Sequence, residues 1–511
     1  MKRRAAVVTA VTASVLIPLP AAAAPSDPAY PATATVRVNP AATHQSIDGF
    51  GGSGAFRVSS VLHGSTGLSP AKQRQLLDVL FSPTTGAGLS ILRNEIGSST
   101  TACTGGPDDG DSVCSIEPDD PGGPDQKPAY VWDGGDTDQV WLTRQARTRG
   151  LRYVEADAWS APAYMKTNGT LGNGGSLCGL PGASACATGD WRQHYADYLT
   201  KYVQLYRKAG LPIDYLAYGN EVDLASAYTG MNWDATSVPG QRGDIDPAVP
   251  QNIDFIGKYL GPTMARAGLD TKVACCEATS WDRTETYADG LLAEPKAQKY
   301  LGVVTGHAYW SAPSGSIGAN PIESARRAGK NTWETETSDF TTYNPTWAGG
   351  NFATSGMQWA LNIQQALVDS NVSAYLYWTL SWQNTPATAD NGNLTLIDGP
   401  NDTYYVPKRL WAFAGFSRYV RPGAVRLDAV SSDSGLKTSA FRNRDGSYVI
   451  VAINTTDKPV ATDYAVPGHR AVPYLTNEAN SMAAQPALRI AHGKFAATVP
   501  PMSMVTFRIA D

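Results

Sequence analysis

Four glutamates end short apolar runs of the sequence, and each could take part in proton transfer or nucleophilic attack. They are Glu95, Glu221, Glu277 and Glu336. Two facing carboxylates can cleave a glycosidic bond: one protonates the leaving oxygen and then activates water, while the other attacks the anomeric carbon. Glu221 and Glu336 end the fourth and seventh of eight runs, so they would face each other across the mouth of a closed barrel. Spacing alone does not exclude Glu95 or Glu277.

Glu334 is a close competitor of Glu336. The two are two residues apart, so on a β-strand their side chains face the same side. Their depth differs, because Glu334 lies about 6–7 Å further from the end of the strand. We therefore expect Glu336 at the barrel mouth and Glu334 below it.

Polar residues at the other run ends could support this chemistry. Asn220 directly precedes Glu221, and its amide could bind a sugar 2-hydroxyl. Arg93 could hold a nucleophilic carboxylate ionised, and Tyr309 could donate a hydrogen bond to the same group. The alternatives are a structural salt bridge for Arg93 and simple packing for Tyr309. His307 would either bind a sugar hydroxyl or fill the rim.

Trp159 and Trp378 also follow apolar runs. A single tryptophan is more often a core residue, but at the end of a strand its flat apolar face could hold a sugar ring. We predict that both contribute to substrate binding.

The apolar runs themselves predict the fold. Most are followed by a helical pattern, as expected for parallel strands that are buried on both faces. Eight such alternations in about 370 residues predict an α/β fold, a (β/α)₈ TIM barrel, whose active site lies at the carboxyl ends of the strands. The runs are 46–51, 89–92, 153–156, 215–217, 273–276, 303–307, 331–336 and 374–378.

The sequence between these runs predicts three helices. Ser69 and Pro70 resemble an N-cap followed by a proline in the first turn of a helix over 71–80. Aromatic and apolar residues recur every three or four positions from Trp191 to Leu205, and Gly210 would end that helix. Residues 358–369 show a similar pattern.

The sequence pattern changes after Arg418. The segments 436–441, 447–454 and 496–509 alternate or carry β-branched residues between turn signals, which predicts a small antiparallel β-domain over 418–511. Residues 33–45 begin with a similar pattern and could donate a strand to it. The barrel would then span 46–417.

The first 24 residues predict secretion. Lys2, Arg3 and Arg4 precede a largely apolar run and then the small residues Ala21–Ala24, as in a signal peptide. Its removal would change the formal charge from −5 to about −8, which disfavours a nucleic acid partner and suits a neutral polymer. We expect a monomer with no membrane association after cleavage, no cofactor and no metal.

Six cysteines fit an oxidising compartment. Cys103 and Cys114 lie in one glycine-rich loop, and Cys178 and Cys186 lie in another, so each pair would close its own loop. No histidine lies at zinc-ligand spacing nearby, which disfavours a zinc site. The adjacent residues 275 and 276 are interpreted as free cysteines that pack in the core, with a vicinal disulfide as the alternative.

Seven stretches of the sequence carry a resemblance to a known family: Ile47–Phe56, Gly88–Ser99, Ala156–Gly169, Gly189–Leu199, Gly306–Pro313, Val372–Trp378 and Lys408–Arg426. They resemble glycoside hydrolase family 30, especially its largely fungal branch, which includes xylanases acting on glucuronoxylan. The resemblance implies a barrel fused to a side β-sandwich that the N-terminal segment completes. It also implies retaining hydrolysis of xylan with Glu221 as acid/base and Glu336 as nucleophile.

The sequence also departs from the family pattern. Val222 follows the acid/base where relatives usually have proline, and the loop over 379–393 carries its own Trp382, a candidate substrate contact. Arg57 lies in the loop where some relatives bind a glucuronate, and it is a second candidate. The alternatives are another β-glycan such as a β-1,6-galactan or glucan, an exo-acting enzyme, or a non-catalytic carbohydrate-binding protein.

Overall fold

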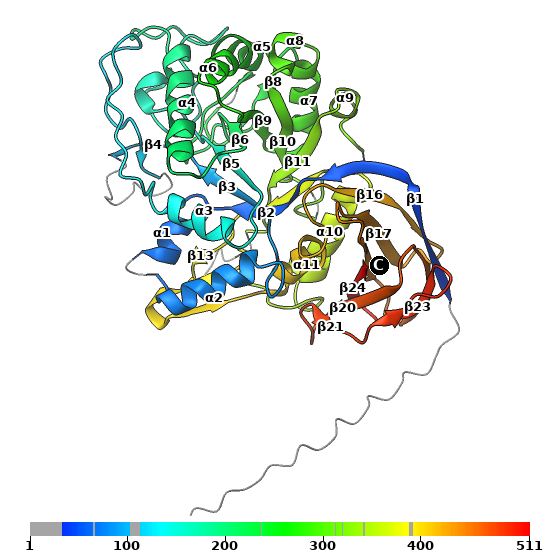
Figure 1. Ribbon diagram of the computed structural model, residues 1–511. Helices are drawn as coiled ribbons and strands as arrows, with labels where there is room; N and C mark the ends of the chain where they lie inside the picture. The colour runs from blue at the N-terminus through cyan, green and yellow to red at the C-terminus, as the bar shows by residue number, and fades with distance from the viewer. Residues whose placement is uncertain are drawn as a thin grey trace, which may run out of the picture.

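Eight parallel strands close into a barrel in the computed structural model, and helices surround it (Figure 1). The structure describes residues 33–510 except 65–66, 103–112, 237, 312, 319, 341–342 and 388–391. The predicted TIM barrel is therefore confirmed. Its strands in order are β2 (Gly49–Ser53), β3 (Ile91–Glu95), β5 (Tyr153–Asp157), β6 (Tyr215–Ala217), β9 (Lys272–Ala278), β10 (Leu301–His307), β11 (Asn331–Glu336) and β12 (Ala374–Tyr377).

The barrel interior is divided into an apolar floor and a polar upper part. Trp333 of β11 is fully buried in the floor, where it packs against Tyr215 and Tyr153 at ring-centroid distances of 4.6 and 6.1 Å. Small or aliphatic side chains from the other strands fill the rest of this layer. Charged side chains above the floor are therefore held on a rigid apolar base.

The predicted helices match α2 (Pro70–Phe81), α4 (Arg192–Lys208) and α10 (Gly356–Val368). Ser69 precedes α2, but its side chain forms no capping hydrogen bond; its backbone N–H donates instead to Asp402 Oδ1 (2.7 Å). The other α-helices are α1 (Val58–His63), α3 (Gln139–Arg147), α5 (Pro250–Asp254), α6 (Gly261–Arg266), α7 (Trp281–Leu292), α8 (Pro295–Gln298), α9 (Glu323–Arg327) and α11 (Lys408–Ser417).

The C-terminal part forms a β-sandwich with its own apolar core. The long strand β1 (Ala34–Ile47) runs from the barrel into this sheet (Figure 1). The sheet order is β21-β20-β24-β18-β17-β16-β1-β19-β23, with β22 beside β20. Its other strands are β16 (Ala424–Ser431), β17 (Leu436–Arg442), β18 (Tyr448–Asn454), β19 (Val460–Ala465), β20 (Arg470–Thr476), β21 (Ala483–Ala484), β22 (Leu488–Arg489), β23 (Lys494–Val499) and β24 (Ser503–Ala510).

Two details of the β-sandwich differ from the prediction. β1 pairs antiparallel with β16 but parallel with β19, so the sheet is mixed. The predicted strand over 496–509 is two strands, because Pro500 and Pro501 interrupt it and proline cannot donate to a ladder.

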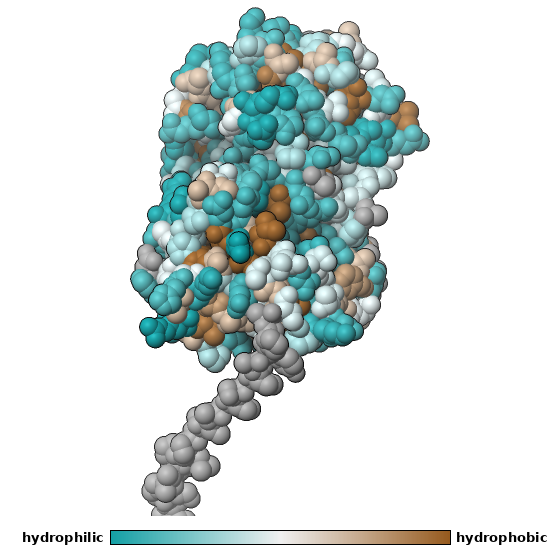
Figure 2. Space-filling model, turned by 90° about the vertical axis from the view of Figure 1, so that its right-hand side faces the viewer, coloured by the Kyte–Doolittle hydropathy of each residue, from teal (hydrophilic) through white to brown (hydrophobic). Residues whose placement is uncertain are grey.

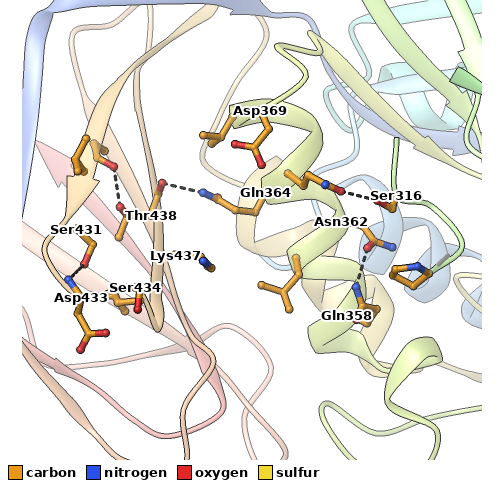
Figure 3. A pocket seen from close by; sticks show the side chains of 17 residues that line it. Ser316, Gln358, Asn362, Gln364, Asp369, Ser431, Asp433, Ser434, Lys437 and Thr438 are labelled. Atoms are coloured by element: carbon orange, nitrogen blue, oxygen red, sulfur yellow. Dashed lines mark hydrogen bonds between the residues drawn. The ribbon is translucent and has the colours of Figure 1, made fainter. Parts of the chain in front are cut away.

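The barrel and the sandwich meet at α10 and α11, whose apolar side chains share one core with β18 and β24. A cavity of about 660 Å³ lies at this seam, between α10 and the β16–β17 hairpin (Figure 3). Gln364 of α10 crosses the seam and donates to the carbonyl of Thr438 (2.8 Å). The face in Figure 2 is mainly hydrophilic, with apolar residues in small groups.

Six short strands lie in the loops of the described part of the chain. They are β4 (Gly97–Ala102), β7 (Ala235–Thr236) with β8 (Asp244–Ile245), and the sheet of β13 (Trp382–Gln383), β14 (Leu396–Asp398) and β15 (Thr403–Tyr405). The predicted signal peptide lies outside the described residues. No helix in the described part of the chain is long and apolar enough to cross a membrane.

Candidate active site

The strand ends bring two carboxylates close together. Glu336 is the last residue of β11, and Glu221 lies four residues beyond β6 in a left-handed backbone conformation (φ +47°). The backbone N–H of Glu221 donates to the carbonyl of Glu277 (2.8 Å), which fixes this turn. A carboxylate oxygen of each residue and a ring nitrogen of His307 all lie within 4.8 Å of one another.

This separation is chemically informative. Retaining glycosidases hold their two carboxyl groups about 5–5.5 Å apart, whereas inverting enzymes need about 6.5–9.5 Å to fit a water molecule. The spacing of Glu221 and Glu336 fits direct attack on the sugar by one of them.

Arg93 is a fully buried cation at the centre of the site. Burial alone would lower its pKa, but the surrounding carboxylates raise it well above its usual value. The guanidinium is therefore permanently charged and holds several acceptors in place. Its Nη1 donates to Glu336 Oε2 (2.5 Å), and its Nη2 lies 2.6 Å from Asp157 Oδ2, 2.5 Å from Asn220 Oδ1 and 3.1 Å from Glu277 Oε2.

Glu336 has donors on both carboxylate oxygens. Tyr309 donates to Oε1 (3.0 Å) and Arg93 to Oε2. Burial raises the pKa of Glu336 above its ordinary value, and His307 and Arg93 only partly oppose the effect. Glu336 is thus a carboxylate that faces the cleft and is held in one orientation by two donors.

Glu277 is held by three hydrogen-bond donors, an arrangement that the sequence did not predict. Its Oε2 accepts hydrogen bonds from Arg93, from His307 Nε2 (3.1 Å) and from Thr335 Oγ1 (2.7 Å). Burial raises its pKa, but Arg93 and His307 outweigh burial and lower the pKa to about 2. Glu277 is fully buried and does not line the cleft, so it can orient Arg93 and His307 but is poorly placed to attack a substrate.

His307 is also fully buried and lies below the cleft surface. Its Nδ1 is 3.5 Å from Glu221 Oε1 and 3.8 Å from Glu336 Oε1. Burial lowers its pKa, but the neighbouring carboxylates, led by Glu336, raise it well above the usual value. The three groups are close enough together to ligate a metal cation, but the Arg93 guanidinium beside Glu336 already supplies positive charge and disfavours one.

The cleft above these groups has a volume of about 580 Å³ and is lined largely by aromatic side chains. Trp159 and Trp378 line it, with their ring centroids 5.8 Å apart. Arg57 and Trp382 are not in its lining; Trp382 packs behind this aromatic cluster. Sequence reasoning did not single out four other aromatic lining residues: Phe56, Tyr228, Trp310 and Phe340.

Tyr228 is the most informative of these additional residues, because its hydroxyl donates to Glu221 Oε2. It comes from the loop after β6, seven residues beyond Glu221. Lys166 supports that loop: it is nearly buried, and its Nζ donates to the carbonyls of Gly230 (2.7 Å) and Leu171 (2.8 Å). Burial lowers the pKa of Lys166 to about 7.

Two sequence profiles match the chain: that of O-glycosyl hydrolase family 30 over residues 33–294, and that of the family 30 β-sandwich domain over residues 423–507. The chain belongs to glycoside hydrolase family 30.

Among solved structures, this family 30 chain is similar to the catalytic domain of xylanase C from Talaromyces cellulolyticus. The two are 37% identical with a TM-score of 0.79, over 93% of this chain and all of the other. It is also 27% identical to an endo-1,6-β-D-glucanase of Aspergillus fumigatus, over 80% of this chain and 79% of that protein. Lysosomal acid glucosylceramidase of Mus musculus is 27% identical, over 63% of this chain and 60% of that enzyme's length.

The cysteines in the described part of this family 30 chain form disulfides. A disulfide joins Cys178 to Cys186, and Cys114 is also disulfide-bonded, while its predicted partner Cys103 lies outside the described residues. The interpretation of Cys275 and Cys276 as free cysteines is wrong, because a vicinal disulfide joins them. The two sulfur atoms are buried side by side in β9, and oxidation removes two thiol donors from that interior.

Replacing Arg93 with methionine is expected to move the acidic limb of the kcat/KM pH profile upward. Arg93 lowers the pKa of Glu336, so without it this carboxyl stays protonated to a higher pH. The loss of a buried partner should also cost about 3–5 kcal/mol of stability. The pH profile of the folded variant, checked by circular dichroism, measures the effect.

Two further variants make this test specific. Arg93→Lys keeps the charge and should shift the limb less. Arg192→Met removes an ion pair with Asp254 (2.6 Å) on the outside of the barrel and should leave the limb in place. An unchanged acidic limb in Arg93→Met would contradict the proposed link between Arg93 and Glu336.

Proposed function

We propose that this family 30 chain is a secreted, retaining endo-β-glycanase that cleaves xylan-type polysaccharide. The observation that carries the proposal is the pair Glu221 and Glu336, whose oxygens lie within 4.8 Å at the base of an aromatic cleft. Two carboxylates at this separation suit double displacement through a glycosyl-enzyme.

The first step forms the covalent intermediate. Glu336 attacks the anomeric carbon, and the bond from that carbon to the glycosidic oxygen breaks as Glu221 donates its proton to this oxygen. Arg93 and Tyr309 stabilise the attacking group in its ionised form, since both donate to it. Asn220 accepts from Arg93 through Oδ1, which aims its amide at the cleft where a sugar 2-hydroxyl would lie.

The second step releases the sugar. Glu221, now ionised, removes a proton from a water molecule, and the water oxygen replaces Glu336 on the anomeric carbon. Tyr228 donates to Glu221 and can hold this carboxylate in place through both steps. His307, whose pKa the neighbouring carboxylates raise, lies near both of them and can stabilise whichever carboxylate is ionised in each step.

Xylan is the favoured substrate because the relative with 37% identity, which this chain covers completely, is a xylanase. The endo-1,6-β-D-glucanase relative supports a β-1,6-glucan as the second candidate. The ion-pair network around Arg93 argues against a protein that only binds carbohydrate, because a binding cleft does not need two carboxylates at this spacing.

Secretion is supported by the basic, apolar and small-residue order of residues 1–24 and by the paired cysteines. The net negative charge suits a neutral polysaccharide rather than a nucleic acid.

A polysaccharide panel with product sizing tests the proposal. We expect the purified protein to release xylo-oligosaccharides of several lengths from glucuronoxylan and unsubstituted xylan, and ¹H NMR to detect the β-anomer first. Release of monosaccharide alone would contradict endo action, and the α-anomer as first product would contradict retention. Hydrolysis of a β-1,6-glucan or β-1,6-galactan but not of xylan would overturn only the substrate.

A further inference from the structure

Two aromatic residues of the cleft are unusual in both exposure and backbone conformation. Trp310 is 67% exposed and Phe340 is 56% exposed, and both line the cavity that contains Glu221 and Glu336. Their φ angles are +64° and +48°, in the left-handed region that bulky side chains rarely adopt. A large apolar ring that stays mostly in solvent on an unfavourable backbone points to a ligand that covers it.

Trp310 belongs to the Glu221 side of the cleft. The guanidinium carbon of Arg242 lies 4.5 Å from the centroid of its ring. Arg242 also forms a backbone bridge with Leu224, whose N–H donates to the carbonyl of Glu221 (2.8 Å). Arg242 thus covers one face of the indole and ties it to the loop that carries Glu221, and the large exposed fraction of Trp310 leaves ring surface for a ligand.

Phe340 belongs to the Glu336 side. It lies four residues after Glu336, in the loop that follows β11. Its ring stacks on Tyr309, with centroids 5.2 Å apart and an interplanar angle of 25°. Tyr309 in turn donates to Glu336 (3.0 Å).

We propose that Trp310 forms a subsite for the sugar ring on the leaving-group side of the cleaved bond, and that Phe340 contacts the retained side. The proposal rests on the proposed roles of Glu221 and Glu336. The leaving sugar starts at the oxygen that Glu221 protonates, whereas the retained sugar lies over Glu336. The C–H faces of a pyranose pack well on an aromatic ring. Subsites on both sides of the bond explain cleavage within a chain.

Substrates with and without a leaving sugar separate the two rings. Xylohexaose places sugars on both sides of the cleaved bond, whereas the fluoride of xylobiosyl fluoride is too small to reach Trp310. Trp310→Ala should lower kcat/KM for xylohexaose about tenfold, as expected for loss of one stacking contact, and leave xylobiosyl fluoride unchanged. Phe340→Ala should lower kcat/KM for both substrates.

Phe352 provides a matched control, because it is an exposed phenylalanine (37%) that does not line the cleft. Phe352→Ala should leave both substrates unchanged. Equal losses on both substrates in Trp310→Ala, or no loss on xylohexaose, would overturn the assignment. If Trp310→Ala fails a thermal unfolding check, Trp310→Leu gives the same comparison.

A failure of the proposed substrate is distinguishable from a failure of the subsite. If the wild-type protein cleaves neither xylo-substrate, the substrate proposal fails. The same variants are then compared on β-1,6-linked gluco-oligosaccharides and gentiobiosyl fluoride. A loss in Trp310→Ala confined to the oligosaccharide still supports the leaving-group subsite, and a loss on both substrates still overturns it.

Discussion

Replacing Glu336 with glycine is expected to lower kcat on xylan by at least about 10⁴-fold, because the nucleophile of a double displacement has no substitute in the site. Arg93 and Tyr309 both donate to this carboxylate, whereas Asp339, another carboxylate in the cleft lining, accepts from Arg409 (2.7 Å). Azide should restore activity by entering the space left by the side chain. The product would be the α-glycosyl azide, since azide then attacks from the face that Glu336 used.

Glu334 provides the matched control for this prediction. It is fully buried below the cleft, and burial raises its pKa well above the usual value, which favours its neutral form. Its Oε2 accepts from the backbone N–H of Leu376 (3.3 Å), which an amide oxygen can also do. Glu334→Gln should therefore keep activity close to wild type. A large loss in Glu334→Gln together with an active Glu336→Gly would reverse the assignment.

Replacing Glu221 with alanine is expected to cause the second-largest loss, about 10²–10⁴-fold on xylan. A xylan leaving group needs a proton, whereas fluoride does not. The formation of the intermediate from xylobiosyl fluoride should therefore stay fast in this variant, and its hydrolysis should become slow. A burst of fluoride release followed by a slow steady state is the expected kinetic record.

Azide gives this variant a distinct signature. It should intercept the intermediate from the side of the missing carboxylate and give the β-glycosyl azide. The two variants would therefore produce opposite anomers. An α-product from Glu221→Ala, or an equal loss on xylan and fluoride without a burst, would contradict its role as acid/base.

The sequence was sufficient to predict the barrel, since each strand and helix leaves a local pattern of apolar residues. It was insufficient for the sheet of the second domain. β1 and β19 are more than 400 residues apart in the chain and pair in parallel, and no local pattern encodes such a partner. The break between β23 and β24 was visible as two prolines and was missed.

Those residues of the candidate site that lie at strand ends could be predicted from the sequence. Arg93 and Glu336 lie within β3 and β11, so the barrel topology alone brings them to one rim. Tyr228, Trp310 and Phe340 come from loops, whose course does not follow from spacing. Burial and hydrogen-bond partners decided which glutamates face the cleft, as the contrast between Glu277 and Glu336 shows.

Trapping the glycosyl-enzyme tests the central claim most directly. A 2-deoxy-2-fluoro-xylobioside with a dinitrophenolate leaving group should inactivate the protein and leave one fluoroxylobiosyl group on it. Peptide mass spectrometry should place that group on Glu336. Labelling of Glu221, Glu277 or Glu334 would contradict the account. Hydrolysis of the fluoroxylobioside without any detectable covalent adduct would contradict it as well.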